Sequence, residues 1–438
     1  MWASWASSPQ ESKIVGPLSP GLSGLACDPQ DRSAEISQSV SGGTVWRCSK
    51  RSGPLVGGLE ELVVSYRRPG AAQISVAEYK VSTIKAGRFR RILLVKPSSL
   101  GDCLQALPVL NALRKALPNA RIVWLVNSEY ADILRNHPAL DDLILFPRRL
   151  FRARQVGVAP CKEVFALWSR LYAERFDLVI DLQGLLRSGV MTLATGAPIR
   201  LGLSDARELA GVFYSQRVHL KPTDVHAVDR YMCCLELLGI RSDQRDFSLP
   251  IEPDVSAELD RILAQADLSR PDKFVLVTPG ARWQSKCWPA ERFASVIDRI
   301  SGELSLACVL SGSPDEAQLC RQVAELCRSK PLNLAGLTTL GQLAALMSFS
   351  DLVLGHDSGT IHLAVALGKP LVCIVGPTDP RRTGPYHRSS SIVTADLDCA
   401  PCRRSVCPDN RCMTLITAES VFAKVKSLLS APSATRLS

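Results

Sequence analysis

Residues 91–102 read RILLVKPSSLGD, and residues 352–362 read LVLGHDSGTIH. In each stretch an apolar run ends in glycine, serine and aspartate, and a helical pattern follows. This layout is typical of a parallel strand whose carboxyl end turns into a crossover helix. The two stretches therefore predict an α/β protein with ligand-binding loops at the carboxyl ends of its strands.

The alternation of apolar runs and helical patterns predicts two such domains, residues 89–250 and 251–416. Strands are predicted at residues 91–95, 121–126, 143–146, 178–182, 199–203, 274–278, 307–311, 332–334, 352–355, 371–375 and 391–393. Helices are predicted at 104–117, where Pro108 must lie near the first turn, and at 418–429, inside a C-terminal helix and tail of residues 417–438. We expect two doubly wound domains facing each other across a cleft.

Residues 1–88 are rich in serine, glycine and proline without sustained periodicity, so they are predicted to be disordered or weakly structured. The first methionine after Met1 is Met191, so a true start inside this extension would use another codon, such as that of Val76 or Val81. We hypothesise that part of the extension is mis-annotated. An intact mass of the native protein that includes residues 2–75 would refute this hypothesis.

The net charge of +10 over 438 residues favours an anionic partner, such as a nucleotide, a phosphorylated lipid or a membrane surface. No apolar run approaches the roughly 18 residues of a membrane-spanning helix, and the N-terminus lacks the layout of a secretory signal. We therefore expect a cytoplasmic protein. No reader module or stacking motif indicates a nucleic-acid partner.

The loop after the first predicted strand carries Ser98, Ser99, Gly101 and Asp102. The small residues suit a tight turn whose backbone amides face the cleft at a helix N-terminus. Asp102 has two interpretations that the local sequence leaves open. It either caps the helix or acts as a general base toward a bound hydroxyl.

The loop after the first strand of the second domain contains Gly280, Arg282 and Lys286. Gly280 lets the backbone approach a ligand, and the two cations can neutralise the negative charge of a departing phosphate. The alternative is a solvated basic loop whose Trp283 and Trp288 pack on the core. Pro289 and Ala290 then open a helix.

A third loop, residues 357–362, should present the amides of Ser358, Gly359 and Thr360 as an anion-binding helix N-terminus. His362 returns to the helix face of Ser358, although a buried core histidine is the alternative. Glu316, after another strand, either hydrogen-bonds a ribose diol or only favours the start of a helix.

Four cysteines lie within 14 residues, at Cys399, Cys402, Cys407 and Cys412. Their spacing favours structural zinc, and reduced thiols or a redox pair are the alternatives. A basic run of Arg148, Arg149, Arg152 and Arg154 is either a solvated loop or a contact with an anionic lipid head group at the cytoplasmic face of the inner membrane.

Five motifs occur together, in one order: residues 96–102 KPSSLGD, 181–188 DLQGLLRS, 282–289 RWQSKCWP, 357–362 DSGTIH and 376–380 GPTDP. Because of these motifs, residues 89–430 resemble the heptosyltransferases, which are glycosyltransferases that build the inner core of lipopolysaccharide. The resemblance implies a GT-B fold, with the glycolipid acceptor on the first domain and a nucleotide sugar, typically ADP-heptose, on the second.

The resemblance further implies an inverting transfer in which Asp102 is the base and Lys286 steadies the diphosphate. Asp357, Ser358, Gly359 and His362 would surround the donor, and Glu316 would touch the adenosine ribose. The acceptor side would hold Ser98, Ser99, Gly101, Asp181, Gln183 and Arg187. A single displacement needs one base and a stabilised leaving group, so no cofactor is expected for catalysis. Alternatives are a non-catalytic sugar-nucleotide sensor or scaffold and an epimerase or hydrolase on the same fold.

Overall fold

The computed structural model describes residues 39–40, 44–51, 61–67, 86–146, 158–220, 226–265 and 268–431, in two compact units, Met1–Ser82 and Thr83–Ser438. The first unit contains an antiparallel sheet of β1 (Ser39–Val40), β2 (Thr44–Arg51) and β3 (Glu61–Arg67). These strands differ from the weakly structured extension expected there. Runs of Val, Thr and Trp favour pairing even where no long periodic pattern exists.

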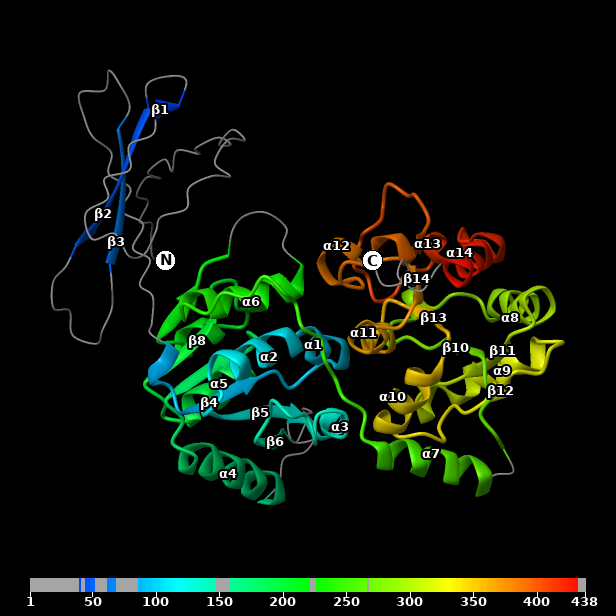
Figure 1. Cartoon of the computed structure of the whole chain (residues 1–438), viewed down its shortest axis with the longest axis horizontal. Helices are drawn as coiled ribbons and strands as arrows, with labels where there is room; N and C mark the ends of the chain where they lie inside the picture. The colour runs from blue at the N-terminus through cyan, green and yellow to red at the C-terminus, as the bar shows by residue number, and fades with distance from the viewer. Residues whose placement is uncertain are drawn as a thin grey trace, which may run out of the picture. The chain divides into compact units, whose positions relative to one another are not determined.

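Two parallel six-stranded sheets form the second unit (Figure 1). Their strand orders are β6-β5-β4-β7-β8-β9 and β12-β11-β10-β13-β14-β15. In both sheets the chain starts in the middle, runs to one edge, and returns to build the other half. The predicted fold class, two doubly wound Rossmann-like sheets, is thereby confirmed.

The strands of the first sheet are β4 (Arg91–Val95), β5 (Arg121–Asn127), β6 (Asp142–Phe146), β7 (Leu178–Asp181), β8 (Ile199–Leu203) and β9 (Gln216–Val218). Those of the second are β10 (Phe274–Thr278), β11 (Ala307–Leu310), β12 (Leu332–Asn333), β13 (Leu352–His356), β14 (Leu371–Val375) and β15 (Ile392–Thr394).

The helices that accompany the first sheet are α1 (Leu100–Gln105), α2 (Leu107–Ala116), α3 (Ser128–Ala131), α4 (Val158–Ala173), α5 (Leu186–Ala194) and α6 (Ala227–Leu237). The later helices are α7 (Pro253–Gln265), α8 (Ala290–Leu304), α9 (Ala317–Leu326), α10 (Leu340–Phe349), α11 (Gly359–Ala366), α12 (Pro380–Thr383), α13 (Arg411–Thr414) and α14 (Ala418–Ser430). None of the helices in these described ranges is both long and apolar enough to cross a bilayer.

Burial on both faces explains why the central strands are almost wholly apolar. Every residue of β10 is buried, and Val275 and Val277 belong to a core cluster with Phe293 of α8 and Phe422 of α14. The first sheet has a matching cluster between β4, β5 and the helices α4 and α5. Parallel strands covered by helices on each side read as continuous hydrophobic runs, which is why sequence alone located them.

The structure departs from the predicted helix at residues 104–117. Two helices replace it, because α1 starts at Leu100 and ends before Ala106, and Pro108 lies in the first turn of α2. The N–H groups in the first turn of a helix have no partner within the helix, so a proline there removes no helical hydrogen bond. The earlier start of α1 places Asp102 in the first turn of that helix. The short strand β9 was not predicted, since two of its three residues are exposed.

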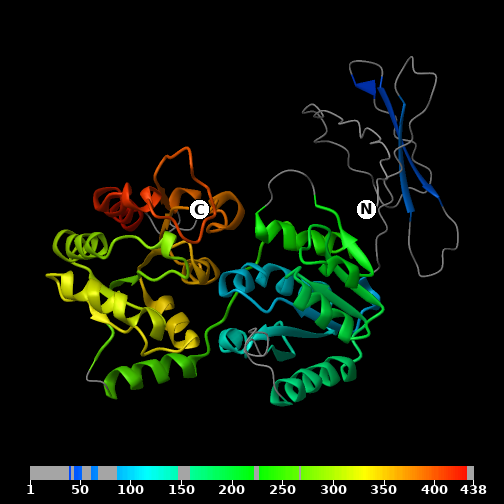
Figure 2. The same cartoon turned by 180° about the vertical axis from the view of Figure 1, so that it is seen from behind.

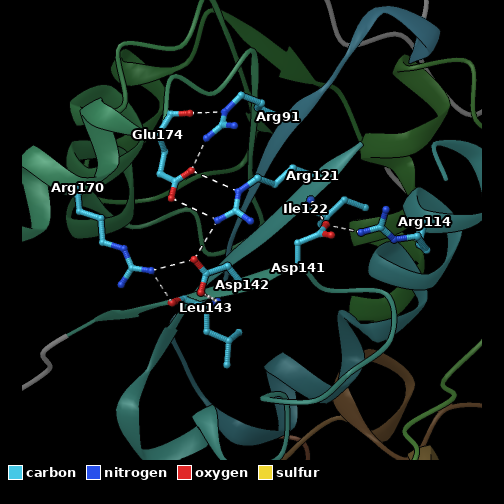
Figure 3. Close-up of polar contacts among 9 residues, drawn as sticks. All are labelled: Arg91, Arg114, Arg121, Ile122, Asp141, Asp142, Leu143, Arg170 and Glu174. Carbon is cyan, nitrogen blue, oxygen red and sulfur yellow. Dashed lines mark hydrogen bonds and ion pairs between the residues drawn. The ribbon is translucent and has the colours of Figure 1, made fainter. Parts of the chain in front are cut away.

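A group of partly exposed ion pairs joins α4 to the first sheet (Figure 3). Glu174, just past α4, accepts from Arg91 and Arg121, and Arg121 also pairs with Asp142 at an N···O distance of 3.0 Å. Arg170 of α4 reaches the same Asp142 at 3.1 Å. Arg91, Arg121 and Asp142 begin their strands, so this network lies at the edge opposite the strands' carboxyl ends.

Replacing Phe422 by Ala should lower the free energy of unfolding by about 3–5 kcal/mol, because a buried aromatic leaves a cavity. Phe422 is 2% exposed, with Arg299 stacked on its ring at 3.9 Å. The matched control is Phe165→Ala on α4, 74% exposed, which should change stability by less than about 0.5 kcal/mol. Urea unfolding of both variants provides the measurement, and equal losses would contradict the assigned core.

Candidate active site

The loops singled out in the sequence all leave the carboxyl ends of central strands. Residues 96–102 follow β4, residues 182–187 follow β7, residues 279–286 follow β10, and residues 357–362 follow β13. In each sheet these two strands are central neighbours. From the first of them the chain continues toward one edge of the sheet, and from the second it continues toward the other edge. The divergence of the crossovers opens a crevice there, the usual ligand site of such sheets.

Asp102 caps α1, as one of its two interpretations predicted, and its role as a general base stays a prediction. Its Oδ2 accepts from the backbone N–H and hydroxyl of Ser99, at 2.9 and 2.7 Å, and so caps α1. Its Oδ1 accepts from the Tyr231 hydroxyl at 3.2 Å and lies 3.7 Å from the Lys96 ammonium. The carboxylate remains 37% exposed. One oxygen is therefore fixed by the helix, and the other lies in a polar, partly open environment.

The charge balance at Asp102 keeps it ionised. Burial alone would raise the pKa of Asp102, but the charge of Lys96 and the hydrogen bonds from Ser99 outweigh burial and lower that pKa. Burial lowers the pKa of Lys96, whereas Tyr231 and Asp102 raise it, and the net shift is upward. The Lys96 ammonium is 3% exposed, donates to the Leu182 carbonyl at 3.0 Å, and lies 4.7 Å from the Tyr231 ring centre.

On the second sheet, Lys286 is held by Asp357. Its ammonium donates to the Asp357 carbonyl at 2.6 Å and to Oδ2 at 3.2 Å. Asp357 is 3% exposed, and the same Oδ2 accepts from the Thr378 hydroxyl at 2.6 Å. Burial opposes its charge, but His362, Lys286 and Thr378 together lower the pKa of Asp357 well below its usual range. Asp357 therefore acts mainly as an anchor for Lys286.

His356 clamps the loop that carries Lys286. Its Nε2 accepts from the Trp288 N–H at 2.9 Å, and its Nδ1 faces the Gly280 carbonyl at 3.4 Å. The ring is completely buried, and burial lowers the pKa of His356 to about 4. A neutral imidazole that accepts at Nε2 and donates at Nδ1 satisfies both contacts. The two ends of the loop are thus tied to β13.

The N-terminal ends of α1 and α11 meet between the two sheets (Figure 1). His362 Nδ1 lies 3.4 Å from the Gln105 side-chain nitrogen, and His362 Nε2 lies 3.6 Å from Asp357 Oδ1. A Cβ at Gly101 would stand 2.5 Å from the His362 ring. At Gly359 it would stand 2.8 Å from the Leu100 side chain. Both glycines are required by this close approach.

A pocket of about 390 Å³ opens where the helices meet. From the first half it is lined by Ser99, Leu100, Gly101 and Tyr130, and from the second by Thr278, Gly280, Ala281, Arg282, Trp283, Lys286, Glu316, Asp357, Ser358, Gly359 and Thr360. Eight predicted donor-side or catalytic residues thus share one cavity: Gly280, Arg282, Lys286, Glu316, Asp357, Ser358, Gly359 and Thr360. His362 lies beneath it, in contact with Asp357.

Glu316 favours the start of a helix, as one of its two interpretations predicted, and its contact with a ribose diol stays a prediction. Its Oε2 accepts from the Ser313 N–H and hydroxyl at 2.7 and 2.9 Å, which caps a 3-10 turn. Its Oε1 lies so near Gly280 that a Cβ there would overlap the carboxylate. Thr360 adds a hydroxyl pair with Thr278 at 3.0 Å. The pocket wall is consequently built from short contacts that tolerate little added volume.

A second pocket, of about 230 Å³, adjoins the first through a shared residue, Arg282. Its lining is Pro97, Ser98, Asn127, Phe146, Gln183, Leu185, Arg187, Ser188 and Arg282. Three residues predicted on the acceptor side, Ser98, Gln183 and Arg187, lie here together. The Ser98 N–H donates to Gln183 Oε1 at 3.2 Å, which joins the loop of Asp102 to the loop after β7.

Ser99 and Gly101, also predicted on the acceptor side, line the larger pocket. Asp181, the last of these predicted residues, is completely buried. Its Oδ1 accepts from the N–H groups of Gln183 and Gly184, and its Oδ2 accepts from the Tyr214 hydroxyl at 2.8 Å. Burial raises the pKa of Asp181 despite these hydrogen bonds. Asp181 therefore orients the loop that bears Gln183 and Arg187.

The four clustered cysteines lie between β15 and α14, from the exposed Cys399 to the buried Cys412. In the ranges that the structure describes, no three His, Cys, Asp or Glu side chains are arranged to hold a metal ion. Their present arrangement does not fit a zinc ligand set, and the zinc site remains a prediction from spacing. The basic run of Arg148, Arg149, Arg152 and Arg154 lies outside the described residues.

Comparison with known proteins agrees with this geometry. A family model described as glycosyltransferase family 9 (heptosyltransferase) matches residues 164–412. The chain belongs to this family. Lipopolysaccharide heptosyltransferase 1 of Pseudomonas aeruginosa is 31% identical over 370 residues, covering 79% of this chain and 100% of the relative.

Two solved structures have the same fold as this glycosyltransferase. A family 9 glycosyltransferase from Veillonella parvula has a TM-score of 0.67 at 25% identity, covering 79% of this chain and 99% of that one. The Escherichia coli heptosyltransferase WaaC with ADP-2-deoxy-2-fluoro heptose has a TM-score of 0.62 at 26% identity, covering 77% and 99%. The GT-B expectation and the predicted enzyme class, a glycosyltransferase, are confirmed.

Sequence reasoning gave no role to several residues that the glycosyltransferase places at the site. Lys96 and Thr378 lie inside the motifs KPSSLGD and GPTDP. A lysine directly after an apolar strand was a usable signal of a site residue. Tyr231 on α6 carried no signal, because it lies 129 positions from Asp102. Asn127, at the end of β5, likewise has no motif around it.

Replacing Lys96 by Met should move the acid limb of the transferase pH profile upward. In the wild type, Asp102 stays charged until the pH falls through its lowered pKa. Removing the ammonium leaves burial as the larger influence, so the pKa of Asp102 rises and activity is lost at a higher pH. The measurement is kcat/KM against pH. Lys115→Met, at an exposed position of α2, should leave the limb in place, and an unmoved limb in Lys96→Met would contradict the assignment.

Proposed function

We propose that this enzyme transfers a heptose from ADP-heptose to a lipopolysaccharide core acceptor, with inversion at the anomeric carbon. The similarity to lipopolysaccharide heptosyltransferases supports the sugar and the acceptor, and the ADP-sugar complex of the Escherichia coli enzyme supports the nucleotide. The observation that carries the proposal is that the Asp102 loop and Lys286 line one cavity from two sheets.

Asp102 is the base in this proposal. Its partly exposed carboxylate is kept charged by Lys96, and Ser99 and Tyr231 hold its orientation. A hydroxyl of the acceptor transfers its proton to this carboxylate as its oxygen attacks the anomeric carbon of the donor. A base held by fixed hydrogen bonds does not have to reorganise during the reaction.

The leaving group is received by the second half. As the new carbon–oxygen bond forms, the bond between the anomeric carbon and the diphosphate oxygen breaks, and the electron pair leaves with ADP. The Lys286 ammonium and the N-terminal amides of α11 lie at the larger pocket, where they would contact the oxygen that leaves with ADP. Positive charge there stabilises the developing negative charge more strongly than it stabilises the bound donor.

Asp102→Asn should lower kcat by about two to four orders of magnitude while the affinity for ADP stays within a few-fold, because the amide keeps the cap but not the base. Asp254→Asn, at an exposed site on α7, serves as the control. Mass spectrometry of ADP-heptose incubated with a deacylated core acceptor measures transfer. Donor consumption without any acceptor would instead indicate the hydrolase or epimerase alternative, and donor binding without turnover would indicate the sensor.

We further propose that α4 contacts the membrane that bears the acceptor. Phe165, Trp168 and Tyr172 recur at helical spacing on one side of α4 and are 74%, 43% and 66% exposed. Arg170 and Glu174 face the sheet side (Figure 3), and the back view shows α4 at the margin of its half (Figure 2). Exposed aromatics preceded by a run of arginines suit an anionic bilayer interface.

The double variant Phe165→Ala/Trp168→Ala should reduce binding to phosphatidylglycerol vesicles at least about threefold in a flotation assay, because interfacial aromatic area is lost. Transfer to a water-soluble acceptor should be unchanged. Leu415→Ala, 53% exposed and distant in sequence, is the control. Undiminished vesicle binding by the double variant would remove α4 from the membrane contact.

A further inference from the structure

We infer that a third pocket, between α6 and residues 380–392, binds the phosphate group of a small molecule, and that its occupation holds the two halves of the enzyme together. The pocket has a volume of about 470 Å³, which is within the range of small-molecule sites. It shares no lining residue with the larger pocket or with the smaller pocket that adjoins it. A ligand there would therefore leave both sites of the proposed transfer reaction free.

The wall of this third pocket comes from both halves. His226 and Asp229, at the start of α6, belong to the first half, and the rest of the lining belongs to residues 380–392 of the second. Two hydrogen bonds cross the junction. His226 Nε2 donates to the Gly384 carbonyl at 2.9 Å, and the Tyr386 hydroxyl donates to Asp229 Oδ1 at 2.9 Å. A ligand in the third pocket would therefore contact both halves at once.

Arg388 brings a guanidinium without a partner to the third pocket. Within the part of the chain that the structure describes, its side chain forms no ion pair and no hydrogen bond, and its Nη1 is buried. This burial lowers the pKa of Arg388. A partly buried charge without a partner is unfavourable, and an anion would supply both the opposite charge and the acceptor atoms that the guanidinium lacks.

The neighbouring charges are already paired with one another. Asp229 is the one carboxylate among the described residues of the lining, and its Oδ1 accepts from Arg245 Nε at 3.1 Å. Arg381, the other arginine of the lining, pairs with Asp379 at an N···O distance of 3.0 Å. The positive charge of Arg388 is therefore the uncompensated charge of this pocket.

A phosphate group fits this environment. Its oxygens accept two parallel N–H bonds from a guanidinium, which is the geometry that makes arginine a common phosphate ligand. The exposed Ser389 lines the same pocket and offers a hydroxyl as a further donor. Pro385 and Ile392 add apolar surface for the carbon atoms of a phosphorylated molecule. Inorganic phosphate and a sugar phosphate share the chemistry that Arg388 would recognise.

The elements that form the third pocket also reach the larger pocket. The helix α6 bears Tyr231, whose hydroxyl contacts Asp102, and the loop after β14 bears Thr378, whose hydroxyl contacts Asp357. The larger pocket is itself lined from both halves. A ligand that holds α6 against residues 380–392 should therefore favour the arrangement that binds ADP, and ADP should favour that ligand by the same factor.

Calorimetry in the presence of saturating ADP tests the binding, because ADP keeps the probes out of the donor site. The probes are glucose 6-phosphate, inorganic phosphate and glucose. We expect the Kd of at least one of the two phosphate compounds to be at least about tenfold below that of glucose. The tighter of the two identifies the source of the phosphate group. Equal binding of all three probes, or binding of none, would overturn the inference.

A second titration tests the coupling between the third pocket and the cleft. The tighter phosphate probe, at saturation, should lower the Kd of ADP at least about fivefold, because both ligands favour the same arrangement of the halves. An unchanged Kd would overturn the coupling. A raised Kd would show that the probe competes with ADP, and it would place the probe in the donor site instead.

Two variants and a control locate the site. Arg388→Gln should raise the Kd of the phosphate probe at least about tenfold, with the Kd of ADP alone unchanged. Ser389→Asp places a carboxylate beside the guanidinium and should weaken phosphate binding to a similar extent even if Arg388→Gln folds poorly. Arg261→Gln, at an exposed position of α7 outside the pocket, should leave every Kd unchanged. Retained phosphate affinity in both pocket variants would overturn the site.

Discussion

The buried carboxylate of Asp357 is the interaction on which the donor half of the site depends. It contacts Lys286 from the loop after β10, Thr378 from the loop after β14, and His362 from α11. Three separate segments therefore converge on one charge that is almost completely removed from water. A buried charge is tolerated only when its partners are all in place, so this carboxylate enforces the relative positions of these three segments.

The acceptor half contains a counterpart with different chemistry. Lys96 is the buried charge there, and Asp102 is its partly exposed partner. Tyr231 contacts both and helps to orient the carboxylate, while the charge of Lys96 favours its ionised form. The Lys96–Asp102 pair and the Asp357 cluster approach each other where Gly101 meets His362. This approach requires glycine at position 101, because a side chain there would push α1 and α11 apart. Catalytic geometry and interdomain packing consequently depend on the same few residues.

Much of the fold was readable because its strands are buried on both faces. Runs such as residues 91–95 and 274–278 predicted their strands to the residue. The failures have local causes. Pro108 divided one expected helix into two, and the exposed β9 had no apolar run to reveal it. In the extension, β-branched residues formed strands where composition indicated weak structure.

Sequence by itself determined which chemical groups the enzyme has near its strand ends, since motif residues such as Asp102, Lys286 and Glu316 lie in the segments that follow apolar runs. Only the tertiary structure decided how those groups are used. It showed that Asp181 is buried and that Asp357 is paired with Lys286, and it left Asn127 without a partner beside two arginines. The physical reason is that burial and pairing join residues far apart in the chain, and no local pattern encodes such contacts.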